Sequence, residues 1–201
     1  MTEPLSVQQM AQRLKSADNI LILCHKNPDG DTVGCGSALY YALKALDKNA
    51  AVLCSDTIPA RYAFTNAHLF KGEFEPETVI AVDVAGLQLF GEGNGVPRYS
   101  RHVDLCIDHH PSNTGYAKRL LLRPTAAAAC ELMTDLLTEL SGLDERMADC
   151  LYTGLVTDTG CFKYSNVTAK THMIVAQLYE YNIDAPEINR IMFDTKSRKL
   201  L

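Results

Sequence analysis

Four short runs in the first half of the chain are almost wholly apolar, and polar or turn-forming residues follow each of them. The runs cover 19–24, 50–54, 78–82 and 104–107. A strand with one face in water alternates apolar and polar residues, whereas a strand buried on both faces is apolar throughout. These runs therefore predict buried strands of a mainly parallel sheet.

Between and after these runs, the apolar residues recur with helical spacing. Met10, Ala11 and Leu14 share one face of a helix expected over 8–17. Further helices are expected over 34–46, 125–140, 144–156, 168–181 and 185–193, and the alanine run 126–129 is interpreted as a tightly packed helix. Strands that alternate with helices predict an α/β fold, a mainly parallel sheet flanked by helices.

Composition narrows the class of protein. A chain of 201 residues with 47% hydrophobic residues predicts one large domain. The 19 Lys and Arg against 24 Asp and Glu, and the absence of Trp, argue against a surface that grips long nucleic acid. Seven cysteines without a C-x-x-C pair indicate reduced thiols and a cytoplasmic location. No apolar run is long enough to predict a membrane span or a secretory leader.

Candidate chemistry gathers at the ends of the predicted elements. His25, Asp29 and Asp31 follow the first apolar run and Asp83 follows the third. Asp108, His109 and His110 follow the fourth run, and Asp158 ends a predicted helix. In a parallel sheet, the carboxyl ends of the strands form one ligand-binding edge, so these side chains should converge there.

Converging carboxylates repel one another, and bound cations would offset that repulsion. A set of carboxylates and imidazoles without thiolates suits Mn²⁺ or Mg²⁺, and two ions about 3.5–4 Å apart form the clamp used in phosphoryl hydrolysis. Taken singly, each residue has a plainer interpretation: Asp83 could cap a turn, Asp158 could cap a helix, and His109 and His110 could be solvated. The repetition of the pattern at four element ends favours the metal site.

The order and spacing of these clusters resemble the DHH phosphoesterase superfamily, which is named for the triplet that stands here as Asp108-His109-His110. Its four motifs match HKNPDGD (25–31), Asp83, DHHPSN (108–113) and TGLVTDTGCF (153–162). The resemblance implies one metal held by His25, Asp29 and Asp83, and a second held by Asp31, Asp83, His109 and Asp158. It also implies that Asp83 bridges the metals, that Asp108 orients an imidazole and that His110 faces the substrate phosphate.

Within the superfamily, the chain looks most like the oligoribonuclease and phosphoadenosine-phosphate phosphatase branch. That likeness implies hydrolysis of short oligoribonucleotides, pAp, or substrates of the pApA and cyclic-dinucleotide type, and leaves a homodimer open. The C-terminal substrate-binding domain usual in the family is absent from this sequence. We therefore expect a catalytic domain over 1–190 and the start of a linker helix over 191–201. The alternatives are a manganese-dependent inorganic pyrophosphatase and a catalytically silent metal-binding regulatory module.

The sequence gives less support for a role in the site to residues outside the four clusters. Lys163, Tyr164, Ser165 and Asn166 follow the fourth motif and could contact phosphate, although such residues more often lie on a surface loop. Cys161 is interpreted as a packed thiol, and Arg119 and Arg123 as charges at the edges of the short apolar run 120–122.

Overall fold

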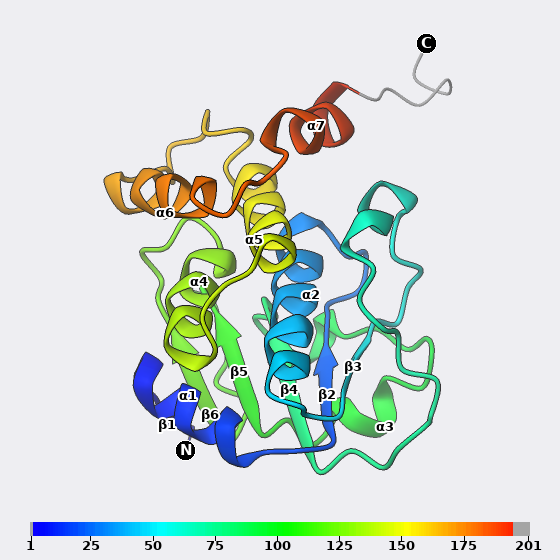
Figure 1. The fold of residues 1–201 in the computed structure, drawn as a ribbon. Helices are drawn as coiled ribbons and strands as arrows, with labels where there is room; N and C mark the ends of the chain where they lie inside the picture. The colour runs from blue at the N-terminus through cyan, green and yellow to red at the C-terminus, as the bar shows by residue number, and fades with distance from the viewer. Residues whose placement is uncertain (1, 195–201) are drawn as a thin grey trace.

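The computed structural model describes residues 2–194 and shows a six-stranded parallel sheet with the strand order β1-β6-β5-β4-β2-β3 (Figure 1). The strands are β1 (Glu3–Pro4), β2 (Ile20–Leu23), β3 (Ala50–Leu53), β4 (Thr78–Val82), β5 (Leu105–Asp108) and β6 (Arg119–Leu122). Both the α/β class and the four predicted strands are confirmed. The two-residue β1 has no apolar run of its own and was not predicted.

The helices are α1 (Val7–Ser16), α2 (Gly30–Ala45), α3 (Pro97–Ser100), α4 (Ala129–Leu140), α5 (Glu145–Asp158), α6 (Ala169–Tyr179) and α7 (Ala185–Asn189). In Figure 1, α1, α2, α4 and α5 lie over one face of the sheet, and α6 and α7 lie beyond its carboxyl edge. A 3-10 helix, Ala60–Thr65, lies between β3 and β4, and a π-helical turn, Arg190–Asp194, follows α7. Of the expected linker helix over 191–201, residues 195–201 lie outside the described part of the chain.

Each face of the sheet contributes alternate strand residues to its own core. Ile20 and Ile22 of β2 pack with α1, α2, α4 and α5, whereas Leu21 and Leu23 pack with Phe90 and Val96 on the other face. All of these strand residues are fully buried, which explains why β2 reads as a continuous apolar run. Within residues 2–194, no helix has both the length and the apolar character needed to cross a bilayer.

Two helices begin four residues away from their predicted starts. Helix α2 starts at Gly30 rather than residue 34, because the Asp29 side chain accepts hydrogen bonds from the backbone N–H groups of Asp31 and Thr32 and caps it. The turn-forming residues of the first motif are thus the cap and first turn of a helix. Helix α4 starts at Ala129 rather than residue 125, and Ala126–Ala128 precede it as buried non-helical backbone. The prediction of a helix through 126–128 was wrong.

Candidate metal centre

The structure brings all eight predicted site residues together at the carboxyl edge of the sheet. His25 follows β2, Asp83 follows β4, and Asp108 ends β5 with His109 and His110 directly after it. Asp29 caps α2, Asp31 lies in its first turn and Asp158 is the last residue of α5. The expected convergence at the strand ends is therefore present.

His25, Asp29 and Asp83 form the first group of facing donors. Nε2 of His25 lies 3.5 Å from Oδ1 of Asp29 and 3.6 Å from Oδ2 of Asp83. Nδ1 of the same ring lies 2.7 Å from the carbonyl oxygen of Lys26. Because a carbonyl can only accept, Nδ1 carries a hydrogen, and Nε2 is the ring nitrogen that faces the carboxylates.

The second group consists of Asp31, His109 and Asp158, with Asp83 beside it. Nε2 of His109 lies 3.4 Å from Oδ2 of Asp158, 3.6 Å from Oδ1 of Asp83 and 3.9 Å from Oδ2 of Asp31. Nδ1 of His109 donates to the carbonyl oxygen of Ala126 at 3.1 Å. In this ring, as in that of His25, a backbone carbonyl holds Nδ1 and Nε2 faces a set of carboxylates.

Asp83 faces both groups with different oxygens: Oδ2 faces His25 and Oδ1 faces His109. Its backbone has φ +57°, a left-handed conformation that Asp tolerates better than most residues but still at a cost. The Asp83 N–H donates to the carbonyl oxygen of Ile107 at 2.9 Å, which holds the turn beside β5. The bend after β4 thus aims one carboxylate between two imidazoles.

Asp108 does not face either group directly but binds the third histidine. Its Oδ1 accepts a hydrogen bond from Nδ1 of His110 at 2.8 Å, and its Oδ2 accepts one from Nδ2 of Asn113 at 2.7 Å. Burial alone would raise the pKa of Asp108, but the bonds from His110 and Asn113 outweigh it and lower that pKa. The bond to Asp108 in turn raises the pKa of His110. Asp108 is therefore an ionised acceptor that fixes one imidazole.

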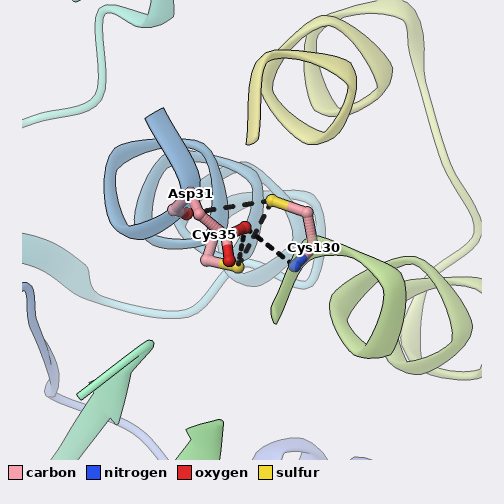
Figure 2. A group of neighbouring side chains, drawn as sticks. All are labelled: Asp31, Cys35 and Cys130. Atoms are coloured by element: carbon pink, nitrogen blue, oxygen red, sulfur yellow. Dashed lines mark hydrogen bonds between the residues drawn. The ribbon is translucent and has the colours of Figure 1, made fainter. Parts of the chain in front are cut away.

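Asp31, in the first turn of α2, is fully buried, and its carboxylate faces the N-terminus of α4 (Figure 2). Its carboxylate accepts hydrogen bonds from the backbone N–H groups of Ala129 and Cys130, the latter at 2.9 Å. The thiols of Cys35 and Cys130 lie 3.4 Å apart behind it, and each lies 3.8 Å from an oxygen of Asp31. The positive end of α4 favours the ionised carboxylate, but burial outweighs this and raises the pKa of Asp31.

The carboxylates are too crowded to be ionised together without a counter-charge. Burial and the charge of Asp31 raise the pKa of Asp83 well above its usual range, and the same two causes raise the pKa of Asp158 to about 9. Burial lowers the pKa of His25, but its bonds to Asp29 and Asp83 outweigh this and raise it to about 11. This electrostatic pattern is that of an anionic cluster in need of protons or cations.

Three buried side-chain polar atoms lack a hydrogen-bond partner within the described chain, and two of them face each other. These two are Oδ1 of Asp83 and Nε2 of His109, 3.6 Å apart. Buried polar atoms without a partner are rare and require an explanation, such as an ion. The oxygen and imidazole donors around them are those that hard or borderline divalent cations take, so the residues fit such ions.

Comparison with known proteins agrees with this geometry. The family model for the DHH family, N-terminal domain, matches residues 19–155. The chain belongs to the DHH family. This match confirms the predicted superfamily.

Curated relatives in the family extend beyond the length of this chain. The bifunctional oligoribonuclease and PAP phosphatase NrnA of Thermus thermophilus is 30% identical over 192 residues, covering 92% of this chain and 57% of that protein. The protein of the same name from Bacillus subtilis is 25% identical over 195 residues, covering 94% and 61%. An exopolyphosphatase-related protein from Bacteroides fragilis superposes with a TM-score of 0.84 at 25% identity, covering 96% and 61%. The chain thus spans about three fifths of the length of these DHH-family proteins.

Several residues that support the DHH site had no role in the sequence-based hypothesis. Asn113 lies inside the third motif, and its amide holds Asp108. Thr32 lies one residue after the first motif, and its hydroxyl donates to the carbonyl oxygen of Val82 at 3.0 Å, tying α2 to the end of β4. Their positions inside or next to a motif were the only feature of the sequence that pointed to a role in the site. The backbone contacts of 126–130 have no side-chain signature, so nothing in the alanine run pointed to them.

Proposed function

We propose that this chain is the catalytic domain of a two-metal phosphoesterase that hydrolyses short nucleotide phosphates. The single observation that carries the proposal is the orientation of Asp83, whose two oxygens face two separate groups of imidazole and carboxylate donors. A carboxylate placed in this way suits a bridge between two divalent ions. The domain is proposed to cover 1–190, with 191–201 as the start of a linker.

The proposed roles follow the two groups. His25, Asp29 and Asp83 hold one ion, and Asp31, Asp83, His109 and Asp158 hold the other. Imidazole and carboxylate donors without thiolate favour Mn²⁺ over a structural zinc ion, and Mg²⁺ is the second choice. When bound, the ions would supply Lewis acidity toward a phosphate oxygen and acidify a water molecule.

His110 and Asp108 are proposed to act on the substrate rather than on the ions. The side chain of His110 is 40% exposed, against 16% for His25 and 12% for His109, so it is the most open of the three histidines at the site. Since Nδ1 of His110 is bound to Asp108, only Nε2 can approach a phosphate. The raised pKa of His110 favours the protonated ring, which can donate a hydrogen bond or a proton to a departing oxygen.

The proposed substrates are short oligoribonucleotides, pAp, and substrates of the pApA and cyclic-dinucleotide type. Support comes from the names of the two NrnA relatives and from the formal net charge of −5, which disfavours long polyanions. All seven cysteines are free thiols, which fits a reducing compartment such as the cytoplasm. A homodimer also stays a prediction.

The test is a comparison of initial rates with Mn²⁺ on pAp, a dinucleotide, pyrophosphate and a strand of about twenty nucleotides, a length beyond one binding fold. We expect the two short nucleotides to be hydrolysed fastest, and Asp83→Asn to abolish all hydrolysis. Preferred turnover of pyrophosphate would instead identify a pyrophosphatase. Absence of all hydrolysis by the metal-loaded chain would favour the silent regulatory module, and faster turnover of the long strand would contradict the short-substrate proposal.

A further inference from the structure

The backbone of Ala126–Cys130 contacts the second group of donors from several sides. The carbonyl oxygen of Ala126 accepts the Nδ1 hydrogen bond of His109 at 3.1 Å. The N–H groups of Ala129 and Cys130 donate to the carboxylate of Asp31. Two of the three members of this group are therefore held directly by one buried stretch of main chain.

The third member, Asp158, is connected to the same stretch through a side chain. Nδ2 of Asn166 donates to the carbonyl oxygen of Ala127 at 3.0 Å and to the carbonyl oxygen of Asp158 at 3.1 Å. An amide nitrogen carries two hydrogens, so it can serve both carbonyls at once. Asn166 thus ties the C-terminal end of α5 to the segment that holds His109 and Asp31.

The connection between Asp158 and Asn166 is a turn with unusual backbone geometry. Gly160, Cys161 and Phe162 have φ values of +55°, +56° and +63°. A left-handed conformation costs a residue with a side chain about 1–2 kcal/mol, so two such residues in succession need compensating contacts. The N–H of Cys161 donates to the carbonyl oxygen of Val156 at 2.7 Å, which closes the turn at one end. The Asn166 bonds close it at the other end.

We propose that Asn166 is a positioning residue for the second metal group, acting through the carbonyl oxygens of Asp158 and Ala127. The inference rests on the proposed function, because it requires that Asp31, His109 and Asp158 bind a divalent ion. Without the amide, the end of α5 loses its hydrogen bond to the segment that orients His109. The carboxylate of Asp158 is then no longer held with its Oδ2 at 3.4 Å from Nε2 of His109. Removal of such outer contacts typically weakens metal affinity by about 10–100-fold.

The experiment titrates Mn²⁺ into the metal-free chain by calorimetry and by electron paramagnetic resonance of the free ion. We expect two ions to bind the natural chain, and Asn166→Ala to weaken one of them by about 10–100-fold while the other keeps its affinity. Asn166→Asp has the same shape but no N–H donor, so it should show the same loss. Asn166→Gln keeps the donors and should recover part of the affinity.

Ser165→Ala is the matched control, because Ser165 is an exposed neighbour in the same turn and its hydroxyl makes no hydrogen bond within residues 2–194. This variant should bind both ions normally. Asn166 is itself exposed, so its replacement removes no core packing, and equal melting temperatures of the metal-free variants would establish that.

A double-mutant cycle separates positioning from general destabilisation. If Asn166 acts through Asp158, Asn166→Ala should have little further effect on affinity in an Asp158→Asn chain, whereas its effect should add to that of Asp29→Asn in the first group. Normal binding of both ions by Asn166→Ala, equal weakening of both ions, or an undiminished effect in the Asp158→Asn chain would overturn the inference. Failure of the natural chain to bind any divalent ion would instead refute the proposed metal centre itself.

Discussion

Oδ1 of Asp108 accepts a hydrogen bond from Nδ1 of His110 at 2.8 Å, whereas the same Nδ1 lies 3.5 Å from Oδ1 of Asp83, the carboxylate that faces both groups of donors. The Asp108 carboxylate is anchored by Asn113 on its other oxygen. This pairing separates the adjacent histidines of the DHH triplet: His109 faces the second group of carboxylates, and His110 is directed by Asp108.

From that separation we predict that His110→Ala lowers turnover by about 10²–10⁴-fold, the range for a positioned acid or base, while Mn²⁺ stoichiometry stays the same. His109→Ala should lose an ion, because its Nε2 is a donor of the second group. Metal analysis after dialysis and initial rates on pAp measure the two effects. Loss of an ion from His110→Ala would show that the roles of the two histidines are reversed.

We predict that Asp108→Asn lowers turnover without loss of either ion, because an amide removes the charge that holds the His110 proton. The pH profile provides the distinguishing measurement. Without the carboxylate, the pKa of His110 should fall toward its ordinary value, so the loss of activity with rising pH should begin at a lower pH than in the natural chain. An unchanged profile would mean that His110 does not act as the acid.

We predict that Asp83→Asn weakens binding of both ions, since one carboxylate faces both groups and an amide carries no negative charge. Asn tolerates the left-handed backbone of Asp83, so the turn itself should survive the substitution. Asp47 has the same φ of +57° but lies on the surface after α2, which makes Asp47→Asn the matched control. Metal content near that of the control would contradict the bridging role.

We predict that Mn²⁺ binding near pH 7 releases protons and strengthens as pH rises. The raised pKa values of Asp83 and Asp158, the latter about 9, mean that the metal-free protein keeps protons that bound ions must displace. Calorimetry in two buffers with different ionisation enthalpies counts the protons released. Asp158→Asn should release fewer, and an equal count in that variant would argue against the raised pKa of Asp158.

The same shifts set the sign of a stability effect in the metal-free chain. A carboxyl group whose pKa is higher in the folded state binds more protons folded than unfolded, so the free energy of unfolding falls as pH rises between the two pKa values. The melting temperature should therefore fall between about pH 5 and about pH 8.5, and added Mn²⁺ should reverse the fall. A flat melting profile without metal would be inconsistent with the crowded carboxylates.

We predict that Gly154→Ala weakens the second ion and destabilises the fold. A Cβ at Gly154 would lie 2.3 Å from Sγ of Cys130 and 2.7 Å from Oδ1 of Asp31, so both must move. Overpacking of this kind typically costs about 1–3 kcal/mol. Gly36→Ala, which would crowd the Cys24 thiol at 2.9 Å and neither Asp31 nor Cys130, should destabilise the chain without a comparable loss of metal. Thermal melts and Mn²⁺ titrations of both variants measure the difference.

Local pattern was sufficient to predict four neighbouring strands of the sheet and the residue types of the site. A strand buried on both faces must be apolar throughout, and β2 is, so the strand and the residues after it could be predicted without coordinates. Because parallel strands present their carboxyl ends at one edge, the convergence of His25, Asp83 and Asp108 also followed from the sequence. The resemblance to DHH proteins then separated the expected roles of these residues, which spacing alone left open.

Tertiary structure alone decided how the site is supported. The contacts of Asp31 with Cys130 and of Asn166 with Ala127 join residues 99 and 39 positions apart, and they depend on how α2, α4 and the turn after α5 pack together. The alanines of 126–128 have good helix propensity, yet they form buried non-helical backbone, and the carbonyl groups of Ala126 and Ala127 bond to His109 and Asn166 instead of to a helical turn. Main-chain hydrogen bonds are common to every residue type, so no side-chain pattern could have predicted which backbone would hold His109 and Asp31.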